Sequence, residues 1–286
     1  MDGEFCPVSE ARIPVLDFGL MRSDATYDVV HVWKGQFFRL DLHIERFERG
    51  IAKLRMTLPF DAAELERILK ECVIRSGLDD AYVEMILTRG IPRAGSRDPR
   101  HAVNRFIAFA IPFGWIADEE QRRRGLNLHI SAIPRIDPAS VDPTVKNYHW
   151  LDLVAGLFEA YDHDRENVIL IDRDGNLTEG PGFNLFAVRD GTVITPGRGV
   201  LEGITRRTAL ELCTELGFST EAGIVSAADL RAADEAFITS TAGGVMPVTC
   251  IDDKPLGDGQ PGPVTKAVTE LYWAKHSDPA WTVPVR

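Results

Sequence analysis

The chain has 286 residues, 44% of them hydrophobic and 26% charged, which is typical of a folded globular protein. Its formal net charge is −11, and no basic block stands out beyond Arg122-Arg123-Arg124, so nucleic acid and anionic membranes are poor candidate partners. The sequence has no apolar run of membrane-spanning length, no secretion signal in its first residues and no metal-ligand spacing among its four cysteines, so we expect a cytoplasmic protein without a metal site.

The first part of the chain predicts helices packed on one sheet, an α+β arrangement. Apolar residues recur at helical spacing from Asp41 to Met56, and Asp61 and Gly77 are a typical cap and stop for a second helix. The expected elements are a strand meander within residues 12–40, helices over 41–56 and 61–76, and strands over 81–90 and 105–113. We therefore predict a small amino-terminal α/β domain over residues 1–114, followed by a polar linker over 115–124.

The remaining residues, 125–286, predict a larger carboxyl-terminal domain in which strands and helices follow one another. The expected elements are a strand over 126–135, a helix over 147–161, a hairpin around the turn 173–176, paired strands over 183–188 and 192–195, a helix over 205–216, a helical turn from 226, a strand over 235–240 and a closing helix over 261–276. The chain is thus expected to be a two-domain protein of the α+β or α/β class.

Lys146 differs from the other six lysines, which lie in turns or in helix-like stretches. It precedes a strongly apolar helical pattern, and its immediate flanks contain no acidic residue. A lysine that is held away from carboxylates and partly desolvated loses its proton more readily, as amine chemistry requires. The alternative interpretation is a surface lysine at the start of a helix.

Four other motifs are suited to a flat, anionic ligand. Glu179 is followed by Gly180-Pro181-Gly182, whose glycines allow close approach to the backbone. The segments 203–206 (GITR) and 240–244 (STAGG) offer the N–H groups of a helix start and a hydroxyl-bearing turn, and Arg39 offers a bidentate guanidinium. Each motif alone has an ordinary interpretation: a solvated loop acid, a helix start, a turn and a rim arginine.

Together these residues meet the requirements of pyridoxal 5′-phosphate (PLP). A lysine forms a Schiff base with this cofactor, and an acid keeps its pyridine nitrogen protonated so that the ring withdraws electrons. Two clusters of N–H groups and an arginine suit the phosphate. No glycine-rich dinucleotide fingerprint competes with this interpretation.

The sequence resembles the fold-type IV PLP-dependent aminotransferases, the group of branched-chain and D-amino-acid aminotransferases, and within it the (R)-selective amine transaminases most. The resemblance extends from about Glu10 to Trp273. The segments that carry it are 23–47, 81–90, VDPTVKN (141–147), LTEGPGFN (177–184), GVLEGITRRT (199–208), TSTAGGVMPV (239–248) and 262–266. The resemblance implies a small and a large domain with the cofactor between them, and a homodimer in which each site is completed by the neighbouring subunit.

The resemblance also implies roles for individual residues. Lys146 corresponds to the catalytic Schiff-base lysine, which also moves the proton between substrate and cofactor, and Glu179 corresponds to the partner of the pyridine nitrogen. The other expected cofactor-binding residues contact the phosphate: Arg39, Ile204, Thr205 and Thr241. The expected substrate-binding residues are Arg22, Tyr27, Val29, Tyr82, Arg93, Arg97, Trp150, Thr241 and Ala242.

The sequence departs from the family where a substrate carboxylate is bound. Branched-chain enzymes have Phe-Glu-Gly-Ile-Arg where this chain has residues 27–31, YDVVH, so the arginine is missing. D-amino-acid enzymes have an Arg-x-His pair in a loop that lacks this spacing here. Arg93 and Arg97 both lie near the position of the single mobile loop arginine of the amine transaminases. Arg22 replaces a frequent histidine, and either favours a donor with a carboxylate or forms a salt bridge at a dimer interface.

We therefore predict a PLP-dependent transaminase that moves an amino group from an (R)-configured primary amine to a keto acid such as pyruvate, in two Schiff-base half-reactions. The first alternative is a D-amino-acid aminotransferase. The others are a lyase of the same fold, similar to aminodeoxychorismate lyase, and a catalytically silent PLP-binding protein.

Overall fold

The structure is a computed structural model that describes Met1 and residues 3–286. Contacts between Cα atoms divide it into two units, each with its own sheet. The first unit comprises residues 1–114, 145–149 and 276–286, and the second comprises 115–144 and 150–275. The mixed helices and sheets confirm the predicted α+β class, while the domain boundaries given above stay a prediction. No helix among the described residues is both long and apolar enough to cross a bilayer.

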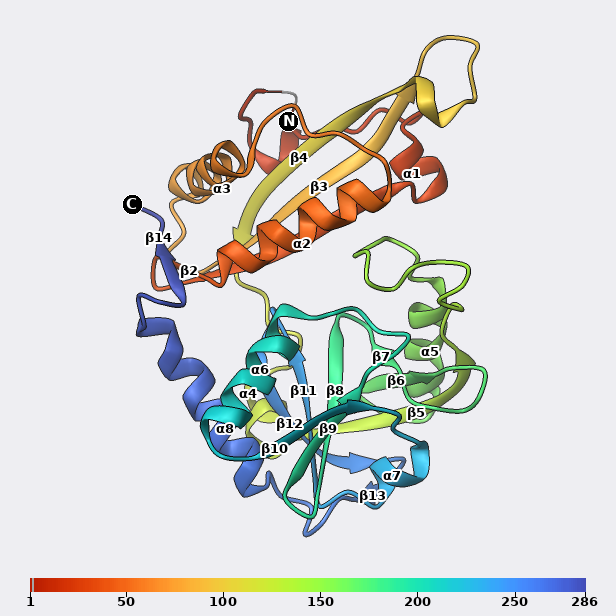
Figure 1. Cartoon of the computed structure of the whole chain (residues 1–286), viewed down its shortest axis with the longest axis vertical. Helices are drawn as coiled ribbons and strands as arrows, with labels where there is room; N and C mark the ends of the chain where they lie inside the picture. The colour runs from red at the N-terminus through yellow and green to blue at the C-terminus, as the bar shows by residue number, and fades with distance from the viewer. Residues whose placement is uncertain (2) are drawn as a thin grey trace. The chain divides into compact units, whose positions relative to one another are not determined.

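The first unit is an antiparallel sheet covered by two helices (Figure 1). Its helices are η1 (Val8–Glu10), α1 (Phe18–Arg22), α2 (Leu40–Lys53), α3 (Ala62–Ser76), η2 (Pro99–His101) and η3 (Lys275–Ser277), the last of which begins at the boundary residue. Its strands are β1 (Ala25–Trp33), β2 (Gln36–Phe38), β3 (Ala81–Pro92), β4 (Ala102–Pro112) and β14 (Thr282–Pro284). They follow the order β14-β2-β1-β3-β4, so the end of the chain supplies an edge strand.

Local sequence explains most of these elements. Lys34 and Gly35 both have positive φ, which matches the twist of a tight hairpin and joins β1 to β2 in the predicted place. The Asp61 carboxylate accepts the N–H of Glu64 at the start of α3, and Gly77 ends that helix with φ +70°. The apolar faces of α2 and α3 pack on β1, β3 and β4 around a core that includes Phe47 and Leu69.

One expectation for the chain before residue 125 is wrong, and the predicted linker contains a helix. Residues 18–22 form α1 rather than part of a strand, because the Asp17 carboxylate accepts the N–H of Gly19 and caps a helical turn. The polar stretch after residue 114 contains α4 (Glu119–Arg124), which begins with a capping box between Asp118 and Gln121.

The second unit contains a nine-stranded mixed sheet with helices packed against it (Figure 1). Its helices are α4, α5 (Leu151–Asp162), α6 (Ile204–Glu215), α7 (Ala227–Arg231) and α8 (Pro263–Ala274). Its strands are β5 (Leu126–Pro134), β6 (Asn167–Ile171), β7 (Glu179–Gly180), β8 (Phe183–Arg189), β9 (Thr192–Pro196), β10 (Ser219–Gly223), β11 (Glu235–Ser240), β12 (Gly244–Ile251) and β13 (Lys254–Pro255). The main order is β10-β9-β8-β11-β12-β5-β6, with β7 paired to β8 and β13 to β12.

Strands β8 and β11 are fully buried apart from Arg189, because they lie in the middle of this sheet. The predicted pairing of β8 with β9 is confirmed, as is the helical turn that Ser226 and Asp229 cap. Strand β7, which begins with Glu179, pairs with β8, so this acid is held at the sheet rather than in a solvated loop.

Candidate active site

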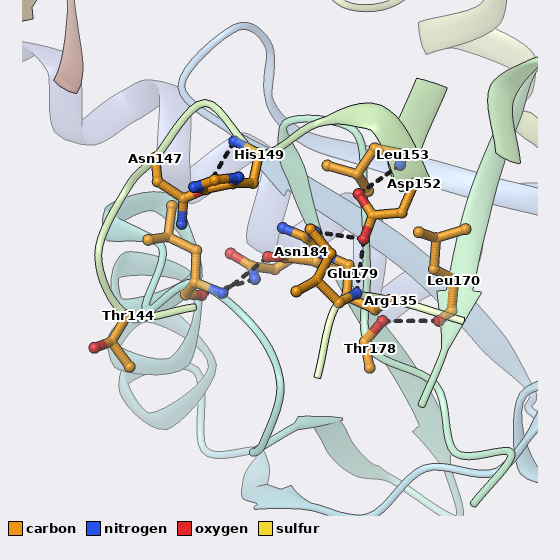
Figure 2. Close-up of polar contacts among 12 residues, drawn as sticks. Arg135, Thr144, Asn147, His149, Asp152, Leu153, Leu170, Thr178, Glu179 and Asn184 are labelled. Carbon is orange, nitrogen blue, oxygen red and sulfur yellow. Dashed lines mark hydrogen bonds and ion pairs between the residues drawn. The ribbon is translucent and has the colours of Figure 1, made fainter. Parts of the chain in front are cut away.

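Lys146 lies on the irregular segment 145–149, which is bonded to β1 in the first unit. The Lys146 carbonyl accepts the N–H of Tyr27 at 3.1 Å and the hydroxyl of Thr26 at 2.9 Å. The Asn147 side chain accepts the N–H of His149 at 2.9 Å, as Figure 2 shows. Such local bonds compete with helix formation, so α5 begins at Leu151 and the predicted start at residue 147 is wrong.

The Lys146 amine lies over an aromatic and acidic group of side chains. Its Nζ is 4.6 Å from the centre of the Tyr27 ring, and that ring stacks on Tyr148 with the centres 4.4 Å apart. The Tyr148 hydroxyl donates to the Glu84 carboxylate at 2.9 Å. Residues opposite one another in β1 and β3 share a face of the sheet, which adds Val29 beside Glu84. We call Tyr27, Val29, Tyr82, Glu84 and Tyr148 the Lys146 patch.

Burial and charge set the protonation states in the patch. Burial raises the pKa of Glu84 above its usual range, against the Tyr148 hydrogen bond and the Lys146 charge, which both lower it. Burial, together with the nearby Glu84 charge, raises the pKa of Tyr82 and Tyr148, so both phenols keep their protons at neutral pH. The patch therefore combines a carboxyl group, phenolic hydroxyls and apolar surface.

Asp28 faces the other side of β1, toward α2. Its carboxylate is fully buried, lies 2.7 Å from His43 Nδ1 and accepts two bonds from Arg46 at 2.7 and 2.8 Å. Burial alone would raise the pKa of Asp28, but Arg46 and His43 lower it well below its usual range. This ion pair fixes α2 to β1 directly behind the patch.

Arg39 is the residue that precedes α2, rather than a residue within a strand. Its φ is +55°, and its N–H donates to the carbonyl of Trp281 at 2.8 Å. Its guanidinium carbon lies 4.4 Å from the centre of the Trp281 ring. Both contacts lie within the first unit.

Glu179 is 7% exposed and is bonded on both carboxylate oxygens in the second unit. One oxygen accepts from Arg135 Nε at 3.3 Å, and the other accepts the N–H of Leu201 at 2.8 Å. Arg135 also donates to Asp152 at 2.6 Å, so one arginine lies between the buried Glu179 and the partly buried Asp152 (Figure 2). A neighbouring guanidinium favours the ionised form of a carboxylate.

Leu201 connects Glu179 to the start of α6. Its N–H donates to Glu179, and its carbonyl accepts Asn184 Nδ2 at 2.9 Å. Gly203 then caps α6 without a side-chain hydrogen bond, and a Cβ there would meet Asn184 Oδ1 at 2.1 Å. The first N–H groups of a helix have no partner within it, so the start of α6 is suited to an anion. Ile204 and Thr205, both buried, form this start.

Thr241 and Ala242 form the turn between β11 and β12, also in the second unit. The turn is fixed by the Ser240 hydroxyl, which donates to the Gly182 carbonyl at 2.8 Å and accepts the N–H of Ala242 at 3.2 Å. Trp150 precedes α5 and packs partly buried against the core around Leu153.

The three arginines expected near the substrate carboxylate are exposed. Arg22 ends α1 with its guanidinium 3.6 Å from the centre of the Phe18 ring. Arg93 and Arg97 lie on the loop between β3 and η2. Glu84, Tyr148, Arg135 and Asp152 were not among the residues predicted from the sequence. For Glu84, the alternation of Tyr82, Glu84 and Ile86 in a strand was the available signal.

Comparison with known proteins identifies the family. The family model described as amino-transferase class IV matches residues 25–251. The chain belongs to the class IV aminotransferases. This class IV aminotransferase is 33% identical to the D-alanine aminotransferase of Bacillus licheniformis, over 99% of this chain and 98% of that one.

Solved structures of the family share the fold. The branched-chain amino acid aminotransferase of Escherichia coli has a TM-score of 0.94 and 25% identity, over 99% of this chain and 97% of that one. The T.th. branched-chain amino acid aminotransferase with pyridoxamine 5′-phosphate has a TM-score of 0.93 and 30% identity, over 100% of this chain and 97% of that one. The predicted fold-type IV aminotransferase family and two-domain fold are thereby confirmed.

Proposed function

We propose that this class IV aminotransferase moves an amino group from an (R)-configured primary amine to a keto acid such as pyruvate. Its cofactor is PLP, the cofactor of the family, and a solved relative contains the amine form. The donor groups of the chain fit this cofactor: a primary amine on Lys146, a buried carboxylate on Glu179 beside Arg135, and the N–H groups that open α6.

Each residue then has a defined task. PLP, when bound, supplies a carbonyl group that reacts with primary amines and a ring that withdraws electrons. The Lys146 amine would accept the proton from the substrate carbon and pass it to the cofactor, and it would move a proton in the opposite direction in the second half-reaction. Glu179 is the proposed partner of the protonated pyridine nitrogen, and Arg135 donates a hydrogen bond to its carboxylate.

The proposed phosphate partners follow from the family resemblance. They are the backbone N–H groups of Ile204 and Thr205, the Thr241 hydroxyl and the Arg39 guanidinium.

The observation that favours an amine over an amino acid as the donor is the charge of the Lys146 patch. Its five side chains are a carboxyl group, three phenols and an apolar side chain, with no cation among them. A substrate carboxylate beside Glu84 would meet a like charge, whereas an apolar substituent can pack on Tyr27 and Val29. The preference for the (R)-amine rests on the family resemblance of the segments around Lys146.

The keto acid must still bind its carboxylate in the second half-reaction. Arg93 and Arg97 are the proposed partners, because both extend from the exposed loop that follows β3, the strand that carries Tyr82 and Glu84. Each arginine is replaced with alanine in turn. The variant that lacks the carboxylate-binding arginine is expected to have a higher KM for pyruvate and an unchanged half-reaction with the amine.

The test is a single half-reaction, followed by the visible absorbance of the bound cofactor. The purified protein is mixed separately with (R)-1-phenylethylamine, (S)-1-phenylethylamine, D-alanine and L-leucine. We expect the (R)-amine to bleach this absorbance with a higher second-order rate constant than the other three substrates. Equal bleaching by both amines would remove the handedness from the proposal.

A D-amino-acid aminotransferase is the second candidate, because of the 33% identity to a D-alanine aminotransferase along nearly the whole chain. Rapid bleaching by D-alanine but by neither amine would establish it and would give Arg22 a role with the donor carboxylate. L-Leucine as the best donor would move the assignment to branched-chain amino acids.

We also propose a homodimer in the cytoplasm. Helix α5 exposes an apolar stripe that includes Leu151, 85% exposed, and Phe158, 64% exposed, which is unusual for a surface left in water. Light scattering during gel filtration tests this, and a monomer at micromolar concentration would contradict it.

A further inference from the structure

The carboxyl-terminal segment, residues 276–286, contacts Arg39 at both its backbone and its side chain. The Trp281 carbonyl accepts the Arg39 N–H at 2.8 Å, and the Trp281 ring lies 4.4 Å from the guanidinium carbon. One residue near the end of the chain thus contacts both parts of the arginine proposed to bind the phosphate.

This segment is itself firmly anchored in the first unit. Strand β14 pairs with β2 (Figure 1). The Val285 N–H donates to the Gly35 carbonyl at 3.0 Å, and the Val285 side chain belongs to the core of this unit. The Phe38 ring stacks on His276 at 3.9 Å and on Trp281 at 6.1 Å. These contacts hold Trp281 in place independently of its contact with Arg39.

Arg39 requires such support for two reasons. Its φ of +55° is one that residues with a side chain rarely adopt, and no side chain among the described residues caps the start of α2. Its long side chain also loses rotamer freedom when it binds an anion. A ring that lies against a guanidinium restricts that side chain, and the guanidinium N–H groups stay available to bind a phosphate in bidentate fashion.

We propose that Trp281 is a positioning residue for the cofactor phosphate: it orients the Arg39 guanidinium so that the edge donors meet the phosphate oxygens. This inference rests on the proposed function, because it needs Arg39 to bind PLP. It requires no contact between Trp281 and the cofactor.

The experiment measures binding rather than turnover, with two probes that differ only in the phosphate. Full-length protein freed of cofactor is titrated with PLP and with pyridoxal, and the ratio of the two dissociation constants reports the phosphate contribution. Arg39→Ala should weaken PLP binding strongly and leave pyridoxal binding unchanged. Trp281→Ala and Trp281→Leu should lower the preference for PLP about 5- to 30-fold, while Trp281→Phe, which keeps an aromatic face, should restore most of it.

Two further variants separate positioning from general damage. Trp33→Ala removes another half-buried indole from the same unit and should leave the ratio at the wild-type value, even if stability falls. The double variant Arg39→Ala/Trp281→Ala should lose no more preference than Arg39→Ala alone, because the two residues act as one unit.

The contrary outcomes are distinct. If Arg39→Ala lowers the ratio but Trp281→Ala and Trp281→Leu do not, the positioning role is wrong and the proposed function stands. The positioning role is also wrong if Trp281→Phe loses as much of the preference for PLP as Trp281→Leu does. If Arg39→Ala leaves the ratio unchanged, Arg39 does not bind the phosphate and the inference is wrong. If the wild-type protein binds neither probe, the proposed function fails first.

Discussion

Lys146 is surrounded by groups whose charges act on one another. Its amine lies over Tyr27, and its charge lowers the pKa of Glu84, which burial raises. Tyr148 connects the two, because its ring stacks on Tyr27 and its hydroxyl donates to Glu84. Tyr148 therefore fixes a carboxylate whose pKa responds to the charge of the proposed catalytic amine.

Replacing Lys146 with alanine is expected to abolish turnover and the visible absorbance of the bound cofactor, because the Lys146 patch contains no amine that could take its place. Lys53→Ala, at the exposed end of α2, is the matched control and should retain both. Turnover by the Lys146→Ala protein would show that another group performs the chemistry.

Glu84→Gln should change substrate preference by removing the like charge that opposes a substrate carboxylate. We expect kcat/KM for D-alanine to rise about 5- to 30-fold relative to (R)-1-phenylethylamine, the equivalent of roughly 1–2 kcal/mol. The exposed Glu45→Gln, in α2, serves as the control. An unchanged ratio would mean that Glu84 does not discriminate between the two donors.

Strand β1 serves two purposes because its side chains alternate between two environments. Tyr27 and Val29 belong to the Lys146 patch, whereas Asp28 and Val30 face α2 and the core. The ion pair between Asp28 and Arg46 thus secures the helix that begins next to Arg39.

Asp28→Asn should destabilise the packing of α2 on β1 by about 3–5 kcal/mol near neutral pH, because it leaves Arg46 buried without its counter-charge. The folded-state pKa of Asp28 is depressed, so its contribution is fully present above the ordinary aspartate pKa of about 4 and is lost progressively as the pH falls from there through the depressed pKa. Hydrogen exchange of the β1 and α2 amides measures this. The wild-type and Asp28→Asn proteins should converge in acid, and a difference that stays constant with pH would contradict the ion-pair explanation. Asp41→Asn, exposed on the same helix, is the control.

Elements with a local cause could be predicted from the sequence, and elements with a distant cause could not. Helix α3 has its cap at Asp61 and its stop at Gly77 within the helix sequence itself. Strand β14 is three residues long and exists because it pairs with β2, more than two hundred residues earlier in the chain. The same holds for the candidate site: Glu179 was predicted from its neighbours and a family resemblance, but Arg135 beside it comes from another part of the chain.

The two units are each assembled from separate parts of the chain. Residues 145–149 and 276–286 belong with the amino-terminal unit, although the segments around them belong to the other. Each unit therefore joins segments that are far apart in the sequence.

Deleting residues 282–286 should destabilise the first unit by about 2–4 kcal/mol, because β2 loses its pairing with β14, although it stays paired with β1, and Val285 leaves the core. Protection of the β2 amides against hydrogen exchange should fall, with little change in β8 and β11 of the second unit. Deleting the exposed residues 3–10 is the control and should have little effect. Full protection of β2 after the first deletion would show that β14 contributes nothing.

The route of the chain also limits how this protein can exchange parts with its relatives. A single crossover at residue 114 would combine β2 with a foreign β14, and Thr26 with a foreign residue at position 147, although each pair is in direct contact here. A chimera that inherits the first unit intact needs joints at residues 114/115, 144/145, 149/150 and 275/276. Recombination libraries built from class IV aminotransferases should therefore inherit the fragments 1–114, 145–149 and 276–286 together, as one block.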